Sequence, residues 1–325
     1  MTRVSNPLAD ARLPLFPFVM PAMLSPRFDQ LTCAHPGGQH RMAWWSWGDA
    51  QAPHVVVCVH GLTRQGRDFD RLAQALVDRA CGRLQVVCPD VAGRGRSDWL
   101  PQAAHYQVPQ YASDMLALLA TLQQRAPIAT LDWVGTSMGG LIGMVLAGQP
   151  QLPMPAPIRR LVLNDVGPAI TWTSVQNMQA FVGRYGRYAD LTQAAAALRA
   201  LAPGFGPVPE AIWRELCVHM VRPHPEGGLT LHYDPAIGEP IRALTPEAAQ
   251  QAEAVLWGLY DQIRAEVLLI RGMDSDLLTP ENAQAMTRRG PQAQLLQWPG
   301  VGHAPTLTAP EQIEALLGFL LGPAA

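Results

Sequence analysis

A serine lies between two glycines at the end of an apolar run, and this pattern can activate a hydroxyl group. The pattern predicts a short strand over residues 131–134 and a helix over residues 141–149, with Ser137 on the turn between them in the pattern Gly-x-Ser-x-Gly. Such a turn projects the hydroxyl away from the sheet, and the N-terminus of the following helix faces the same point with free N–H groups. The pattern suits a nucleophile whose attack creates an oxyanion. The alternative is an ordinary glycine-rich turn.

Reactive side chains also follow other predicted strands. The ends of these strands carry His60-Gly61-Leu62, the pair Asp274 and Asp276, and His303. Ligand sites in open α/β sheets form at the carboxyl ends of the strands, so these groups are expected to lie near Ser137. Their coincidence is a stronger signal than any one motif.

The elements that must position these residues alternate between strand and helix. A hairpin is predicted first, with strands at 28–34 and 41–47. The apolar runs typical of buried parallel strands are 55–59, 84–88, 131–134, 158–163, 267–270 and 294–297. The helices predicted between and after them are 66–80, 109–124, 281–289 and 311–321. This alternation predicts a mostly parallel α/β sheet of eight strands.

The alternation of strands and helices stops between residues 171 and 263, where no buried strand is predicted. Helical stretches are expected at 175–185, 190–201, 210–221 and 246–259. About ninety residues are too many for a crossover connection, so they predict a separate helical layer. We therefore expect an N-terminal arm (1–26), an α/β core in two parts (27–166 and 264–325) and an inserted helical cap (167–263).

Composition excludes several classes of protein. The 325 residues carry a net charge of −2 and no basic stripe with interleaved aromatic residues, so nucleic acid is not an expected partner. No run is long and apolar enough to predict a membrane span. The five cysteines form no CxxC pair, and Cys58 and Cys88 lie in apolar runs, which indicates reduced core residues. A cytoplasmic protein is expected. Export is the alternative, because residues 13–24 are apolar, but three prolines interrupt them.

The motifs together resemble the α/β-hydrolase superfamily, specifically its cap-bearing members similar to serine carboxylesterases. The resemblance covers the chain from about residue 27 onward. Its motifs are His60-Gly61, Gly93-Arg94-Gly95-Arg96-Ser97, Gly135-Thr136-Ser137-Met138-Gly139-Gly140, Arg271-Gly272-Met273-Asp274-Ser275-Asp276 and Gly302-His303. It implies an α/β-hydrolase fold with a helical cap, and it implies catalysis without a metal or an organic cofactor. The histidines are scattered and show no metal-ligand spacing.

The resemblance implies a catalytic triad. Ser137 is the expected nucleophile and His303 the expected base, since a serine hydroxyl needs a base and an imidazole titrates near neutral pH. Asp276 is the expected acid, because it lies four residues before the proline that begins the next helix. Asp274 is the second choice. Asp165, which follows the strand after the nucleophile, is the third, at a position that some members of the fold use for the acid.

The resemblance also implies an oxyanion hole built from the backbone N–H groups of Leu62 and Met138. Arg64 is a candidate for gripping a substrate carboxylate, and a structural salt bridge with Asp68 or Asp90 is the alternative. Trp172 is the best candidate in the cap for the wall of an apolar pocket.

The expected function is hydrolysis of carboxylic esters with small to medium acyl chains, through an acyl-enzyme on Ser137. The partner is then a small-molecule ester. A lactonase, a thioesterase or a hydrolase of carbon–carbon bonds would use the same triad. A ligand-binding protein without catalysis is a further alternative. The sequence does not indicate an oligomeric state.

Overall fold

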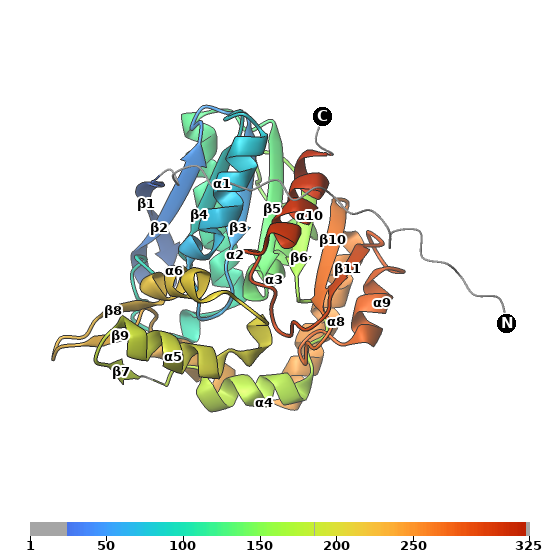
Figure 1. The fold of residues 1–325 in the computed structure, drawn as a ribbon. Helices are drawn as coiled ribbons and strands as arrows, with labels where there is room; N and C mark the ends of the chain where they lie inside the picture. The colour runs from blue at the N-terminus through green and yellow to red at the C-terminus, as the bar shows by residue number, and fades with distance from the viewer. Residues whose placement is uncertain (1–24, 185, 323–325) are drawn as a thin grey trace, which may run out of the picture.

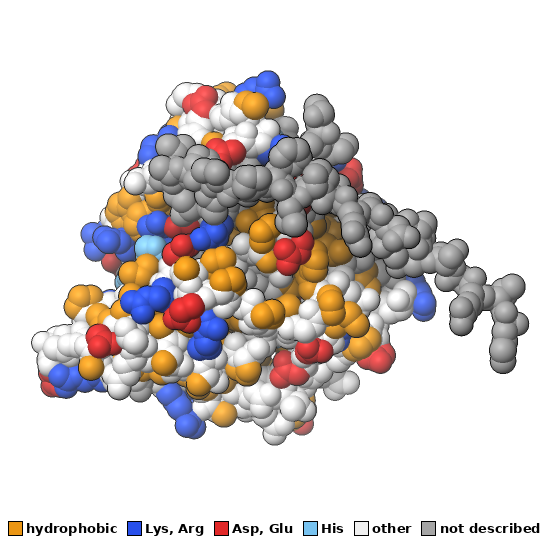
Figure 2. Space-filling view, in the orientation of Figure 1, with side chains coloured by type: hydrophobic (Ala, Val, Ile, Leu, Met, Phe, Trp, Pro, Cys, Tyr) orange, Lys and Arg blue, Asp and Glu red, His pale blue; other side chains and the backbone are white. Residues whose placement is uncertain are grey.

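The structure, a computed structural model, describes residues 25–184 and 186–322. Of the predicted N-terminal arm, residues 1–24 lie outside the described residues. Within the part of the chain that is described, no helix has the length and apolar character needed to cross a bilayer. On the face shown in Figure 2, acidic and basic side chains are interspersed among apolar ones and do not gather into a large patch of one sign.

Eight strands form one sheet in the order β1-β2-β4-β3-β5-β6-β10-β11 (Figure 1). The strands are β1 (Arg27–His35), β2 (Gly38–Gly48), β3 (His54–Val59), β4 (Gln85–Pro89), β5 (Thr130–Thr136), β6 (Ile158–Asn164), β10 (Glu266–Gly272) and β11 (Gln294–Trp298). The β1–β2 hairpin is antiparallel, as is the pairing of β2 with β4, and the remaining neighbours are parallel. The mostly parallel eight-stranded sheet predicted from the sequence is therefore confirmed.

The central strands are buried on both faces, which explains their continuous apolar runs. Along β3, Val55, Val57 and Val59 pack on one face, and Val56 and Cys58 pack on the other. The second face carries α1 (Asp70–Arg79) and α10 (Pro310–Leu321), which contact each other. The first face is covered by α2 (Val108–Arg125), α3 (Met138–Ala147), α8 (Pro246–Gln262) and α9 (Pro280–Met286). Short 3₁₀ helices, η1 (Gly66–Phe69) and η2 (Ala103–His105), lie in the connecting loops.

The interval between β6 and β10, referred to below as the cap, lies mostly below the large sheet in Figure 1, at one end of its strands. Its helices are α4 (Trp172–Phe181), α5 (Leu191–Leu201), η3 (Pro203–Phe205), α6 (Glu210–Met220), η4 (Pro235–Ile237) and α7 (Gly238–Arg242). The interval also contains a small antiparallel sheet made of β7 (Arg187–Tyr188), β8 (Val221–Pro223) and β9 (Leu229–Leu231). The expectation of helices alone was wrong on this point, because strands of two or three residues are too short to show a period.

The last helix of this interval returns to the core. Helix α8 packs along α3, and a side chain at Gly148, just after α3, would meet the carbonyl oxygen of Leu259 at 2.4 Å. The cap is also joined to the core loop after β4 by backbone hydrogen bonds. The N–H of Asp234 donates to Gly93, and the N–H of Gly95 donates to His232, at 2.7 and 3.0 Å.

A buried carboxylate ties three central strands together at the end of the sheet opposite the serine turn. Asp132 in β5 is fully buried, and its Oδ2 lies 2.7 Å from Nε2 of His54 at the start of β3. Arg159 in β6 donates to both carboxylate oxygens, at 2.9 and 2.5 Å. Burial favours the neutral acid, but the hydrogen bonds from His54 and Arg159 outweigh it and lower the pKa of Asp132.

Replacement of this anchor is expected to destabilise the core. For Asp132→Ala we expect the free energy of unfolding at pH 7 to fall by about 2 kcal/mol, because charge-assisted hydrogen bonds are lost from a buried site. A group with a lowered pKa stabilises the fold above its unfolded value of 3.8, so the difference should narrow as the pH falls below that value. Urea unfolding measures both effects.

Glu314→Ala is the matched control, because it removes a surface ion pair with Arg79 whose glutamate side chain is 55 % exposed. Its effect should be below about 1 kcal/mol. Equal losses in the two variants would contradict the anchoring role of Asp132.

Candidate active site

Ser137 occupies the sharp corner between β5 and α3, with φ 52° and ψ −116°. A non-glycine residue in this region is strained, and such corners persist only where the surroundings enforce them. The flanking glycines allow this close packing. A side chain at Gly135 would lie 2.3 Å from the carbonyl oxygen of Gly139, and a side chain at Gly139 would lie 2.0 Å from the carbonyl oxygen of Val59. The indole of Trp133 donates to the same Gly139 carbonyl at 3.0 Å.

A continuous line of hydrogen bonds runs from Ser137 through His303 to Asp165. Nε2 of His303 lies 3.0 Å from Oγ of Ser137, and Nδ1 lies 2.7 Å from Oδ2 of Asp165. An ionised Asp165 only accepts hydrogen bonds, so Nδ1 carries the proton and Nε2 is free to accept one from the serine hydroxyl. Acyl transfer by a serine requires this geometry: a hydroxyl beside an imidazole whose other nitrogen is held by a carboxylate.

The aspartate against His303 differs from the first choice made from the sequence. Asp276 is exposed, and its carboxylate accepts from the side chain of Asn177 at 3.3 Å, while its backbone carbonyl accepts from Thr171 and Ser174. Asp274 is also exposed. The expectation that Asp276 or Asp274 contacts the imidazole was therefore wrong, and the third choice, Asp165, is the residue in place.

The position of β6 in the sheet explains why Asp165 reaches the imidazole. The strand lies between β5, which ends just before Ser137, and β10, whose end and following loop contact the carboxylate. Asp165 comes directly after β6 and is fully buried. Its Oδ1 accepts from the N–H of Gly272 at 2.9 Å, and its Oδ2 accepts from the hydroxyl of Ser275 at 2.6 Å. The loop that was expected to supply the acid thus supplies two donors to it.

Asn164 and Ser275 are site residues that the sequence did not single out. The side-chain amide of Asn164 donates to the hydroxyl of Thr136 at 3.0 Å and to the carbonyl of Pro305 at 2.8 Å, so it joins the serine corner to the histidine loop. The backbone carbonyl of Asn164 accepts from Ser137 N–H at 3.0 Å. For Asn164, the only signal in the sequence was an amide beside an aspartate at a strand end.

The loop after β3 approaches the serine corner from the other side. A side chain at Gly61 would lie 3.7 Å from Cβ of Ser137, so the loop holding Leu62 lies against the serine corner. The position of Met138 follows from that of Ser137, since it is the first residue of α3. These are the two residues whose N–H groups were expected to form the oxyanion hole.

His60 supports this loop as a neutral bridge. Its Nδ1 lies 2.7 Å from the carbonyl oxygen of Gly61, and its Nε2 lies 3.0 Å from the nitrogen of Val91. Nδ1 therefore donates and Nε2 accepts. Burial lowers the pKa of His60 to about 3, so the ring is uncharged at neutral pH.

The two residues predicted to touch the substrate have different surroundings. The guanidinium of Arg64 donates to both carboxylate oxygens of Asp68, at 2.6 and 2.8 Å, and lies 5.3 Å from the ring centre of Phe205 in the cap. This is the structural salt bridge considered as the alternative to substrate binding. Trp172 is the half-buried first residue of α4, and its contact with substrate stays a prediction.

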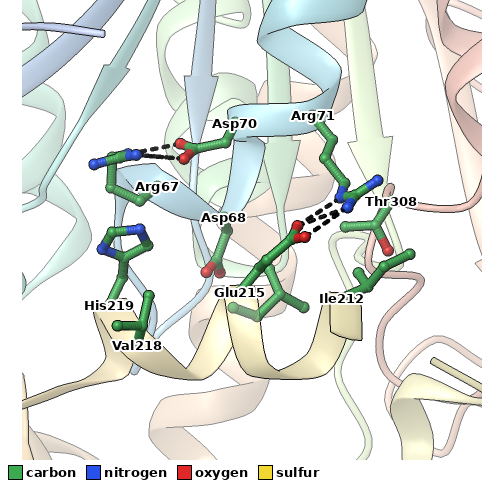
Figure 3. A pocket seen from close by; sticks show the side chains of 10 residues that line it. Arg67, Asp68, Asp70, Arg71, Ile212, Glu215, Val218, His219 and Thr308 are labelled. Carbon is green, nitrogen blue, oxygen red and sulfur yellow. Dashed lines mark hydrogen bonds and ion pairs between the residues drawn. The ribbon is translucent and has the colours of Figure 1, made fainter. Parts of the chain in front are cut away.

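A separate cavity of about 180 Å³ lies between the core and the cap (Figure 3). One wall comes from η1 and α1 and the other from α6. Arg71 of α1 is paired with Glu215 of α6 at 2.7 Å, and Arg67 is paired with Asp70 at 2.6 Å. None of the described residues that line it is Ser137, His303 or Asp165. The cavity therefore lies where the core meets the cap and is separate from those three residues.

One group of potential metal ligands occurs among the described residues. Cys33, His40 and Asp114 are buried with ligand atoms within 4.8 Å of one another. Burial raises the pKa of the Cys33 thiol, and Nε2 of His40 lies 3.1 Å from the carboxylate of Asp114. A protonated thiol and a histidine–aspartate contact form a buried polar network that does not need an ion.

The fold and the serine site together are those of an α/β hydrolase. The family model described as the alpha/beta hydrolase family matches residues 56–316, and the chain belongs to this family. The family and the hydrolase class predicted from the sequence are thereby confirmed.

Individual relatives agree with this membership. The chain is 46 % identical over 301 residues to a 3-hydroxybutyrate-oligomer hydrolase from Cupriavidus necator, covering 92 % of this chain and 99 % of the relative. It resembles the crystal structure of an alpha/beta hydrolase from Novosphingobium aromaticivorans with a TM-score of 0.74 and 31 % identity, covering 91 % of this chain and 98 % of the other. An X-ray structure from Rickettsia typhi gives a TM-score of 0.77 at 26 % identity, with coverage of 91 % and 99 %.

The lowered pKa of His60 has a measurable consequence for stability. The folded pKa, about 3, lies below the unfolded value of 6.5, so the protein should lose stability as the pH falls below 6.5. Between pH 7 and pH 5 this residue should account for a loss of roughly 2 kcal/mol. In His60→Gln this contribution to the change of the unfolding free energy with pH should disappear, although the variant should be less stable at pH 7. Urea unfolding at several pH values measures the slopes, and equal slopes in the two proteins would contradict the assignment.

Proposed function

We propose that the protein is a serine hydrolase that cleaves carboxylic esters through an acyl-enzyme on Ser137. The observation that carries the proposal is the hydrogen-bonded line Ser137–His303–Asp165. The roles are nucleophile for Ser137, general base and acid for His303, and orienting carboxylate for Asp165. The N–H groups of Leu62 and Met138 are proposed as the oxyanion donors.

The reaction follows from these positions. Oγ of Ser137 bonds to the ester carbonyl carbon while its proton passes to Nε2 of His303, and the carbonyl electron pair moves onto the oxygen as an oxyanion. The intermediate collapses, the bond to the alcohol oxygen breaks, and that oxygen takes the proton from His303. Water then attacks the acyl-enzyme, giving its proton to His303, which returns one to Ser137 as the carboxylic acid leaves. Asp165 stabilises the imidazolium in both halves.

We propose small to medium esters as substrates, and among them esters of short hydroxy acids. The Cupriavidus necator relative is named for hydrolysis of 3-hydroxybutyrate oligomers, whose units are joined by ester bonds. The relative matches along 99 % of its length, which supports a substrate of the same kind. Lactones, thioesters and carbon–carbon bonds are the competing targets, because the same triad cleaves them.

The nucleophile assignment is tested by Ser137→Ala. We expect kcat on p-nitrophenyl butyrate and on a linear 3-hydroxybutyrate dimer to fall by at least about 10⁴-fold, because no other group supplies the attacking oxygen. A fluorophosphonate probe should label the wild-type protein at Ser137 and leave the variant unlabelled. Full activity in Ser137→Ala would sink the proposal, and tight binding of the dimer without turnover or labelling would favour a non-catalytic ligand-binding protein.

The bond that is cleaved is tested by comparing kcat/KM for the dimer with values for a lactone, a thioester and a vinylogous diketone. The dimer should have the highest value. A higher value for any of the other three would replace ester hydrolysis with that reaction.

The acid assignment is tested by the pair Asp165→Asn and Asp276→Asn. The first change should lower kcat roughly 10³- to 10⁴-fold, because an amide cannot stabilise the imidazolium or hold its tautomer. The second should change kcat by less than about threefold, since the exposed Asp276 carboxylate is hydrogen-bonded to Asn177 and not to His303. Steady-state kinetics at pH 8 distinguish the two, and the reverse order of effects would return the role to Asp276.

A further inference from the structure

Arg94 is a buried cation outside the Ser137–His303–Asp165 line. The residue is 0 % exposed, yet none of the ion pairs within 4.0 Å among the described residues includes its guanidinium. Its partners are neutral. Nη1 donates to the carbonyl of Ala92 at 2.7 Å and to the hydroxyl of Tyr111 at 2.9 Å, and the Tyr111 ring centre lies 4.9 Å away. A buried charge without a counter-ion is costly, so its presence calls for a compensating role.

The remaining contacts of this guanidinium reach both halves of the proposed oxyanion hole. Nε of Arg94 donates to the carbonyl oxygen of Leu62 at 2.8 Å. Nη2 lies 3.5 Å from Sδ of Met138. One rigid, planar group therefore touches the two residues whose N–H groups are proposed to bind the oxyanion, and it places a full positive charge beside them.

The backbone of Arg94 is fixed as well. It lies between Gly93 and Gly95, the two residues that hydrogen-bond to Asp234 and His232 of the cap. Arg94 itself forms a β-bridge with Tyr233. Backbone contacts with the cap thus fix the position of Arg94, and its charged side chain extends toward the loop of Leu62.

We propose that Arg94 is a positioning residue that locks the Leu62 loop against Met138 and lends its charge to stabilisation of the anionic tetrahedral intermediate. The inference rests on the proposed serine hydrolase function. Because the guanidinium is buried, it acts through the two oxyanion residues and not by touching the substrate. Its effect should therefore be on the transition state and not on binding of the ester.

The test compares Arg94→Gln, which keeps a hydrogen-bond donor without the charge, with Arg94→Lys, which keeps the charge without the planar fork. We expect Arg94→Gln to lower kcat on p-nitrophenyl butyrate roughly 10- to 100-fold with KM changed less than about threefold. Its affinity for a trifluoromethyl ketone, which forms an anionic adduct with serine, should fall by the same factor. Arg94→Lys should recover part of the loss in both measurements.

Arg96→Gln is the matched control, because Arg96 lies two positions along the same loop but is exposed and contacts Phe28 and Trp45. It should keep wild-type kcat. Thermal unfolding checks that each variant folds. If Arg94→Gln does not fold, Arg94→Lys against Arg96→Lys tests the positioning part of the proposal, because Arg94→Lys loses the planar hydrogen-bonding group while keeping the charge, and its kcat should then fall without a matching change in KM.

Two results would overturn the proposal: unchanged kcat in the Arg94 variants, or a loss confined to KM. A fluorophosphonate that labels Ser137 in the wild type while the Arg94 variants turn over normally would sink this inference alone. Absence of labelling and turnover in the wild type would remove the proposed function, and the role of Arg94 with it.

Discussion

The backbone at Ser137 is held in a conformation that costs energy, and the surrounding packing must maintain it. The carbonyl of Val59 comes so close to Gly139 that a methyl group there would overlap it, and Gly135 is equally crowded. The buried strands β3 and β5 therefore need to be in register before the serine can project from the sheet. The order of the sheet, the glycine pair and the indole of Trp133 all serve this one corner, and the positions of the other site residues depend on it.

The parallel sheet brings the remaining groups together because the carboxyl ends of its parallel strands lie side by side. His303 follows β11, Asp165 follows β6, and the donors to Asp165 lie at the end of β10 and in the loop after it. Hydrogen bonds join these strand ends and the loops after them, including the bridge made by Asn164 between the serine corner and the histidine loop. Asp165 is fully buried, whereas the His303 side chain is 26 % exposed, so the site is closed beneath the imidazole and more open around it. This difference in exposure is expected of a site that binds its substrate on the side of His303 that faces solvent.

The sequence was sufficient for the sheet and the serine corner, because each leaves a local signal, and it also singled out the histidine that lies beside Ser137. Continuous apolar runs mark the buried strands, and two glycines around a serine mark the corner. The choice among Asp165, Asp274 and Asp276 had no such signal, since all three follow strands and only the packing of the loop after β10 decides between them. The donors Asn164 and Ser275 were missed for the same reason, because their partners lie far away along the chain. The short strands of the cap were missed because two or three residues show no period.

The cap is connected to the core at the places where the proposed chemistry occurs. Asp165 is the first residue of the interval that leads into the cap, Gly204 accepts a hydrogen bond from Gly302 beside His303, and His232 and Asp234 hold the loop of Arg94. A cap inserted in this way is not an interchangeable module. Exchanging the whole cap for another would disturb the loops that hold Asp165, His303 and Arg94 at once. Substitutions within the cap that spare these attachment points would leave all three loops in place.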